Sequence, residues 1–184
     1  QLGFIVNHKQ QINKETKIVL GSEYQNGNYS ILVDTREQSS LKLKDFPHEV
    51  RKLDFGDYGL EIDGKLVCVF ERKNPSDLAG SIMAGHKRLV NETNRAKADN
   101  FQLAIAAECS YSDFINKKFD GGYMIRKPGY VLAKIIHTMQ LHHNIQFLFF
   151  NGRDEMRDYI RNTFNAIITE HIKKNINKEY DREN

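Results

Sequence analysis

The segment from Leu53 to Leu78 is rich in acidic residues and contains a Glu-x-Lys motif. These residue types and their spacing indicate which reactions this chain could catalyse. Asp63-Gly64 is a two-residue hairpin signal between apolar runs, so it predicts a strand over Lys65–Phe70. Side chains alternate faces along a strand, and Glu71 and Lys73 therefore project the same way. A carboxylate that holds a divalent cation, beside a lysine that orients water or steadies negative charge, suits metal-assisted phosphodiester hydrolysis.

Asp57 is the candidate for a second metal ligand. A regular hairpin would place Gly56 opposite Glu71, which leaves Asp57 on the wrong face of its strand. One extra residue restores the alignment, and Gly59 is a natural position for it. We therefore expect a β-bulge or a strand break between Asp57 and Glu61.

Asp34 is the candidate for a third ligand, direct or through water. It follows the apolar run Ile31–Val33, which is typical of a strand buried on both faces. An acid at the carboxyl end of such a strand lies where α/β sheets bind their ligands. We favour Asp34 over Glu37, because Glu37 can simply pair with Arg36 at the surface. Oxygen ligands select a hard cation such as Mg²⁺ or Mn²⁺ over zinc.

A structural interpretation of the same acids competes with the catalytic one. Acids beside a turn are commonly solvated, and Glu-x-Lys occurs by chance in many proteins. Asp77 has a good structural explanation, since Asn74 is placed to cap a helix and Pro75 to occupy its first position. An acid in the first turn then complements the helix dipole.

Three motifs in order give the chain a specific family resemblance. Gly56-Asp57-Tyr58, then Glu71-Arg72-Lys73, then Asp77 resemble the GD…ERKxxxD signature of the ERCC4-type (XPF-like) nuclease domain family. The upstream segment Val33–Glu37 is similar to the V-D-[ST]-R-E strand end of that family. The resemblance extends roughly over Ser30–Lys173 and is greatest to the short bacterial and phage members.

The helix that follows also resembles those short members, with one departure. The matching residues are Ser81, Ile82, Gly85, Arg88, Glu92, Arg95 and Ala96. His86 stands after Gly85, where the family pattern has an arginine. This departure removes one candidate for a DNA contact and leaves the acidic set complete.

The resemblance implies an α/β restriction-endonuclease-like fold, a three-layer sandwich with a central mixed β-sheet flanked by helices. It implies a Mg²⁺- or Mn²⁺-dependent endodeoxyribonuclease that acts on branched, flap or fork DNA. In the mechanism we expect, Asp34, Asp57 and Glu71 hold the ion with help from a backbone carbonyl near Arg72, and Lys73 positions the nucleophile. The residues expected to contact substrate are Arg36, Arg72, Asp77, Arg88 and Arg95, and Glu108 is expected near the site.

Two other classes of protein stay open at this point. One is a catalytically silent subunit of the same fold that binds DNA or pairs with a partner. Loss of Asp57, Glu71 or Lys73 would mark it, and all three are present. The other is a binding protein whose acids only cap turns and helices, which a metal titration would distinguish.

Composition fits one globular domain of 184 residues, with 40% hydrophobic and 28% charged residues. No apolar run is long enough to span a membrane. The net charge of +3 permits DNA binding without demanding it. Cys68 and Cys109 are expected to be reduced thiols, which fits a reducing cytoplasm. The family resemblance implies a bacterial or phage-encoded protein that is cytoplasmic or nucleoid-associated.

Strands and helices alternate along the rest of the chain. Residues 1–29 are expected to form an arm or a hairpin, 30–173 the nuclease domain and 174–184 a charged, frayed tail. Helices are predicted over 76–97, 111–118, 128–142 and 153–173, strands over 101–107 and 145–150, and a basic loop over 119–127. The apolar coverage of the last two helices suggests self-association, as a homodimer or with a partner subunit.

Overall fold

The computed structural model describes residues 29–43, 47–121 and 125–183. In these ranges six strands form one mixed sheet in the order β2-β1-β3-β4-β5-β8. Their bounds are Tyr29–Val33 (β1), Glu49–Val50 (β2), Tyr58–Ile62 (β3), Lys65–Lys73 (β4), Gln102–Ala107 (β5) and Gln146–Phe149 (β8). Because β3 is antiparallel to both β1 and β4, and β4, β5 and β8 are parallel, the carboxyl ends of β1, β4, β5 and β8 meet at one edge.

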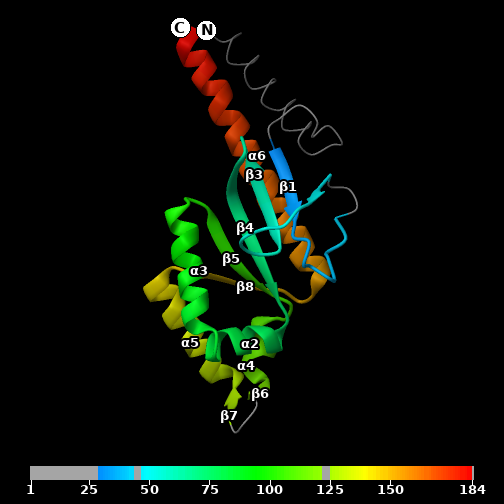
Figure 1. Cartoon of the computed structure of the whole chain (residues 1–184), viewed down its shortest axis with the longest axis vertical. Helices are drawn as coiled ribbons and strands as arrows, with labels where there is room; N and C mark the ends of the chain where they lie inside the picture. Colours follow the sequence, from blue (N-terminus) through cyan, green and yellow to red (C-terminus); the bar gives the residue numbers. More distant parts are fainter. Residues whose placement is uncertain (1–28, 44–46, 122–124, 184) are drawn as a thin grey trace.

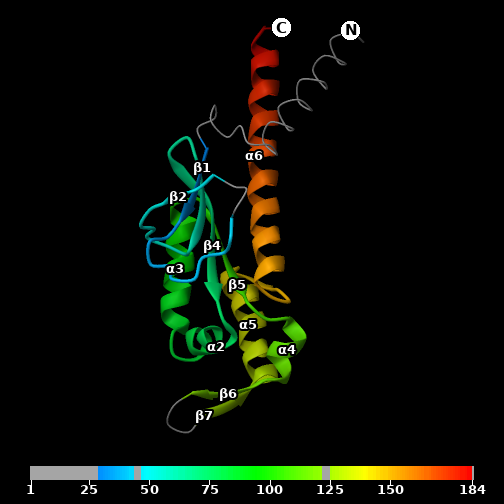
Figure 2. The same cartoon turned by 90° about the vertical axis from the view of Figure 1, so that its right-hand side faces the viewer.

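Helices cover both faces of the sheet and complete the predicted three-layer α/β sandwich. They are Pro75–Met83 (α2), His86–Ala98 (α3), Tyr111–Asn116 (α4), Gly129–His143 (α5) and Arg153–Glu183 (α6). Helix α6 lies on one face, and α2, α3 and α5 lie on the other (Figures 1 and 2). The last part of α6 extends past the sheet at the end opposite α2.

The alternation of side chains along β5 divides the core between these two faces. Ala104 and Ala106 belong to a cluster with the buried side of α6, which is formed by Met156, Ile160, Phe164 and Ile168. Ile105 and Ala107 belong to a second cluster with α2, α3, α4 and α5. A strand buried on both faces in this way is the reason that residues 103–107 form a continuous apolar run.

The helix predicted over 76–97 is wrong in one respect, because the structure contains two helices there. The backbone N–H groups of Ala84 and Gly85 both donate to the carbonyl of Gly80, at 2.9 and 3.2 Å, and α2 ends. Glycine is a poor residue for a helix interior, so the chain turns at Gly85 and α3 starts afresh. The apolar stripe continues across the break, since Leu78, Ile82 and Leu89 enter the same cluster.

Two further expectations about loops and tails are corrected. The segment expected to be a basic loop contains the antiparallel strands Lys118–Gly121 (β6) and Ile125–Pro128 (β7), which project from the body beside α4 (Figure 2). The tail expected to fray is helical, because α6 runs on to Glu183. The other predicted helices and strands are present with ends shifted by a few residues.

The arm or hairpin expected over residues 1–29 lies outside the described residues except for Tyr29, which begins β1. Within the described part, none of the helices has the length and apolar character that a membrane span requires. Cys68 and Cys109 are both free thiols, and burial raises the pKa of Cys68 to about 12.

Candidate active site

Asp57 lies beside the carboxyl end of β4, just beyond the last residue pair of the β3–β4 ladder. Tyr58 pairs with Phe70, and the backbone N–H of Asp57 donates to the carbonyl of Phe70 at 2.8 Å, so Asp57 lies beside Glu71. The register shifts between Leu60 and Glu61, as expected for a bulge between Asp57 and Glu61. The extra residue, however, is Val67 of β4 and not Gly59, because Cys68 pairs with Leu60 and Leu66 with Glu61.

Asp57 has the most perturbed carboxyl group of this site. Burial and the neighbouring charge of Glu71 raise the pKa of Asp57 to about 7, with a further contribution from Glu37. The backbone N–H of Arg72 donates to Oδ2 of Asp57 at 2.7 Å and opposes this rise, as does the charge of Lys73. Burial and a neighbouring carboxylate thus both disfavour the charged form of Asp57, and a bound cation would favour it.

Glu71 and Lys73 lie on one face of the strand end, as their spacing predicts. Lys73 Nζ donates to Glu71 Oε1 at 2.6 Å. Both side chains are largely buried, with 26% of the Glu71 side chain and 11% of the Lys73 side chain exposed. The ammonium is therefore held beside the Glu71 carboxylate with little contact with solvent.

Asp34 does not join the other two acids, and the expectation of three carboxylates around one ion is corrected. Its Oδ1 accepts from the backbone and side-chain N–H of Arg36, at 2.8 and 2.7 Å, and its Oδ2 accepts from the backbone of Leu53 at 2.6 Å. Burial alone would raise the pKa of Asp34, but these hydrogen bonds outweigh it and lower the pKa to about 2. Among the described residues, no three His, Cys, Asp or Glu side chains are placed around a common metal position.

Asp34 instead orders the loop that precedes Asp57. Its backbone N–H donates to the carbonyl of Asp57 at 2.9 Å, while its side chain holds Leu53. Arg36 completes this arrangement by donating to the carbonyl of Leu53 at 2.7 Å. The side chain of Arg36 is 63% exposed. Its hydrogen bond to Asp34 is the main cause of the rise in its pKa, and the charges of Asp57 and Glu71 add to it.

The side chain of Arg72, expected to contact substrate, is 17% exposed and is engaged in ion pairs with acids. Its guanidinium forms two hydrogen bonds to Glu37, at 2.8 and 2.9 Å, and a third to Glu108 at 2.7 Å. Glu37 is correspondingly 4% exposed, which corrects the expected surface pair with Arg36. The sequence gives one signal for this cluster, since Glu37, Arg72 and Glu108 each stand at or just after the end of a predicted strand.

Asp77 is part of a helix cap. Asn74 Oδ1 accepts from the backbone N–H groups of Ser76 and Asp77, at 2.9 and 3.0 Å, and Asn74 Nδ2 donates to Asp77 Oδ2 at 2.6 Å. This is the structural explanation that the sequence offered, in place of a substrate contact.

Arg88 and Arg95 lie on the solvent side of α3. Arg88 is 3.5 Å from Glu92, an exposed pair one helical turn apart. The guanidinium of Arg95 lies 4.9 Å from the ring centre of Phe55. Both arginines line a shallow surface groove together with Ala84, Lys87, Asn91 and Asn94.

Comparison with known proteins places this arrangement in a family. The model of the ERCC4 domain matches residues 33–163, well over half of the chain. No curated protein matches the chain.

Solved structures agree with the fold. XPF from Aeropyrum pernix is similar with a TM-score of 0.55 and 21% identity, over 76% of this chain and 65% of that chain. XPF from Aeropyrum pernix in complex with DNA is similar with a TM-score of 0.51 and 20% identity, over 77% and 65% of the two chains. This chain thus spans less than two thirds of the length of either structure, and at such identity the likeness concerns the fold. The sheet, the helices on both its faces and the extent of the family match together establish that this chain belongs to the ERCC4 domain family.

Proposed function

We propose that this protein is a Mg²⁺- or Mn²⁺-dependent endodeoxyribonuclease that hydrolyses phosphodiester bonds in branched, flap or fork DNA. The observation that carries the proposal is the pairing of Asp57 and Glu71 at the end of the β3–β4 ladder, with Lys73 Nζ 2.6 Å from Glu71. Domains of this family are generally structure-specific DNA endonucleases, and one solved relative is described in complex with DNA.

The donor groups of this site fit a hard divalent cation. Asp57 and Glu71 supply carboxylate oxygens, the ligands that such a cation prefers. Cys68 is buried on the opposite side of β4 with the α6 cluster. Burial and the charge of Glu71 raise the pKa of Asp57 to about 7, and a cation at this position would stabilise its charged form. When bound, such a cation supplies Lewis-acid stabilisation of developing charge on the phosphate.

Protein groups supply the remaining functions in this proposal. Lys73 orients the attacking water and stabilises negative charge in the transition state. Arg36, which is exposed beside Asp57, contacts a phosphate of the cleaved strand. Arg88 and Arg95 contact the duplex backbone from α3.

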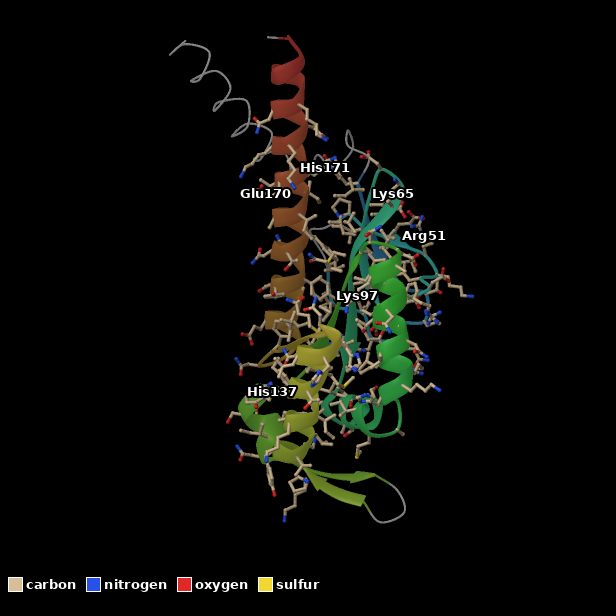
Figure 3. The ribbon with its side chains drawn as sticks, turned by 90° about the vertical axis from the view of Figure 1, so that its left-hand side faces the viewer. Arg51, Lys65, Lys97, His137, Glu170 and His171 are labelled. Carbon is tan, nitrogen blue, oxygen red and sulfur yellow. The ribbon has the colours of Figure 1, made fainter. Side chains whose placement is uncertain are left out.

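Cleavage of end-labelled linear, flap, fork and Holliday substrates tests the proposal. Wild-type protein should cut at least one branched substrate with Mg²⁺ or Mn²⁺ and none with chelator. Lys73→Ala should fold normally and cut at least ~100-fold more slowly, the scale for losing one stabilising charge. Lys65→Ala is the matched control, because Lys65 begins the same strand beside the β3–β4 turn (Figure 3).

Each outcome of this assay has one meaning. Wild-type protein that leaves every substrate intact, or cuts equally well in chelator, contradicts a metal-dependent nuclease. Lys73→Ala protein with the wild-type rate removes Lys73 from the mechanism. Equal cleavage of linear and branched DNA removes the preference for branched structures alone.

A further inference from the structure

Four charged side chains form a continuous chain of ion pairs behind the candidate site. Arg72 binds Glu37 through two hydrogen bonds and Glu108 through one, and Oε1 of Glu108 also accepts from Arg153 Nη1 at 2.9 Å. Acids and arginines alternate along this chain, so each interior charge has an opposite charge on both sides. We name Glu37, Arg72, Glu108 and Arg153 the rear network.

The rear network joins elements that are distant in sequence. Glu37 follows β1, Arg72 is in β4, Glu108 follows β5 and Arg153 begins α6. Arg153 also donates to the carbonyls of Ser39 and Ser40, the second at 3.2 Å. The N-terminus of α6 is thereby tied to three points at the carboxyl edge of the sheet.

The rear network and the candidate site occupy opposite faces of the same strand end. Arg72 lies between Glu71 and Lys73 in β4, and successive side chains of a strand point to opposite faces. Arg72 therefore faces α6, whereas Glu71 and Lys73 face the other layer. The backbone N–H of Arg72 donates to Asp57 Oδ2 at 2.7 Å. Arg72 therefore connects the two faces: its side chain belongs to the rear network, and its backbone binds the candidate metal ligand Asp57.

We infer that Glu108 and Arg153 are positioning residues for the metal site, acting through Arg72 from the opposite face of β4. This inference rests on the proposed function. The charged side chain of Arg72 can stay largely buried only while its N–H groups donate to carboxylates. Glu37 accepts from Nε and Nη2 of Arg72, and Glu108 accepts from Nη1. Arg153 fixes Glu108 in turn, because both arginines donate to the same oxygen.

Loss of Arg153 should loosen this support without removing any group that contacts the cation or DNA. Glu108 would then be free to rotate away from Arg72, and the strand end that carries Glu71 and Lys73 would lose one of its restraints. Groups that hold metal ligands from behind change metal affinity or activity by about 10- to 100-fold when they are removed. A misplacement of about 1 Å at the reacting atoms has an effect of similar size.

Arg153→Gln and Glu108→Gln test the inference in the full chain, with Arg157→Gln as the matched control. Arg157 lies one turn further along α6 and pairs with Asp154 and Asp158 of the same helix. Three quantities are measured for each protein well below its melting temperature: the Mn²⁺ dissociation constant by calorimetry, and kcat and KM for cleavage. Melting curves give the stability separately.

We expect Arg153→Gln to weaken Mn²⁺ binding and to lower kcat, each by at least about 10-fold, with KM for DNA changed by less than about 2-fold. Glu108→Gln should behave in the same way. The double variant should be little worse than either single one, because both act through one contact. Arg157→Gln should leave all three quantities at their wild-type values.

A lower melting temperature with unchanged Mn²⁺ affinity and kcat in Arg153→Gln would show that the rear network is only structural, and would overturn the inference. A change in KM alone would also overturn the inference, since it would indicate that Arg153 contributes to DNA binding and not to the position of the metal ligands. Should Arg153→Gln fail to fold, Glu108→Gln and Arg153→Lys decide by the same measurements. Failure of the proposed function has a different signature, in which wild-type protein itself neither binds Mn²⁺ nor cleaves DNA.

Discussion

Asp34 and Asp57 are adjacent in the structure but lie in opposite environments. The backbone N–H of Asp34 donates to the carbonyl of Asp57, yet the pKa of Asp34 is lowered to about 2 and that of Asp57 raised to about 7. Asp34 is surrounded by hydrogen-bond donors, whereas Asp57 is buried beside Glu71. An isosteric change to asparagine at each position should therefore affect stability in opposite directions.

Asp57→Asn should stabilise the metal-free protein and abolish cleavage. An aspartate in the unfolded chain has a pKa near ~3.9, so between about pH 4 and 7 the folded protein binds a proton that the unfolded chain does not. The contribution of Asp57 to stability therefore falls as the pH rises through this window. At pH 8 the asparagine variant should gain roughly 0.5–2 kcal/mol in the free energy of unfolding, measured by urea titration without metal.

Mn²⁺ provides the complementary measurement on the same pair of proteins. Mn²⁺ should raise the melting temperature of the wild type and raise that of Asp57→Asn much less. A ligand stabilises the folded state according to its affinity for that state, and the variant lacks one carboxylate of the proposed metal site. An active Asp57→Asn protein would end the assignment of this acid to the metal site.

Asp34→Asn should destabilise the protein at neutral pH. The folded pKa of Asp34 lies below the unfolded value, so its contribution is present above about pH 4 and is lost as the pH falls toward 2. The variant should lose roughly 1–3 kcal/mol at pH 7, since Arg36 and Leu53 lose a charged acceptor. Urea titrations at pH 7 and pH 3 measure this, and a smaller loss at pH 3 is expected. Equal stability at pH 7 would contradict the structural role of this carboxylate.

At the scale of elements, the start of β3 depends on a close approach to β4. Gly56 has φ +64°, and a Cβ there would lie 2.2 Å from Val69 Cγ1 and 2.9 Å from the carbonyl oxygen of Phe70. The neighbouring turn offers a control, because Gly64 has φ +73° but a Cβ there would meet no atom within 4 Å. A substitution at Gly64 therefore tests backbone strain alone, whereas a substitution at Gly56 tests backbone strain together with a steric clash against β4.

Gly64→Ala should cost about 1 kcal/mol in the free energy of unfolding, the scale for a left-handed residue that is not glycine. Gly56→Ala should cost at least ~2 kcal/mol more, because β3 must move away from β4, and it should also lower cleavage by displacing Asp57. Urea titrations and the flap cleavage assay measure both effects. Equal losses in the two variants would show that the packing against β4 is unimportant.

Helix α3 is the element expected to contact the DNA backbone. Arg88→Ala should weaken DNA binding and reduce the slope of log K against log salt by about one, if it neutralises one phosphate. Its stability should stay within ~0.5 kcal/mol of the wild type, since the Arg88–Glu92 pair is exposed. Lys173→Ala on α6 is the control, because Lys173 pairs with Glu170 on the other face of the molecule. An unchanged salt slope in Arg88→Ala would show that Arg88 does not contact a DNA phosphate and only pairs with Glu92 at the surface.

At the scale of the whole molecule, the last two helices are used by the protein's own core. The buried side of α5 includes Leu132, Ile136 and Met139, which pack with α2 and α3. The buried side of α6 packs on the opposite face of the sheet. Their apolar coverage therefore needs no partner to explain it, and Leu141, 83% exposed, is the large apolar residue that α5 leaves most open to solvent.

The same division predicts which part of α6 the fold requires. Among the side chains that the structure describes, the core contacts of α6 extend to Ile168 and, partly buried, to Ile172. Deletion of the chain after Lys173 should thus lower the melting temperature by only a few degrees and leave cleavage unchanged. Deletion after Thr163, which also removes Phe164 and Ile168, should abolish folding. A large loss of stability in the shorter deletion would mean that residues 174–184 contribute to the fold.

Local sequence determined the geometry that depends on a single strand or hairpin. Period two placed Glu71 and Lys73 on one face, and the turn at Asp63-Gly64 together with an extra residue brought Asp57 beside them. Most helices and strands followed from apolar spacing for the same reason, since each depends on neighbours a few residues away. The helix break at Gly85 and the β6–β7 ribbon were missed, because a stripe can continue across a break and polar strands lack an apolar signal.

Tertiary structure alone decided which charges became partners. Arg72 reaches Glu37 and Glu108 across 35 and 36 positions of sequence, and Arg153 reaches Glu108 across 45. The strand order brings these residues to one edge, and the alternation along β4 sends Arg72 to the α6 side while Glu71 faces the other. Asp34 was separated from the proposed metal site in the same way, because its pKa and its partners depend on a loop that returns from Leu53. Spacing along a chain fixes the face on which a side chain lies, but the charges that meet it there depend on how the strands are ordered.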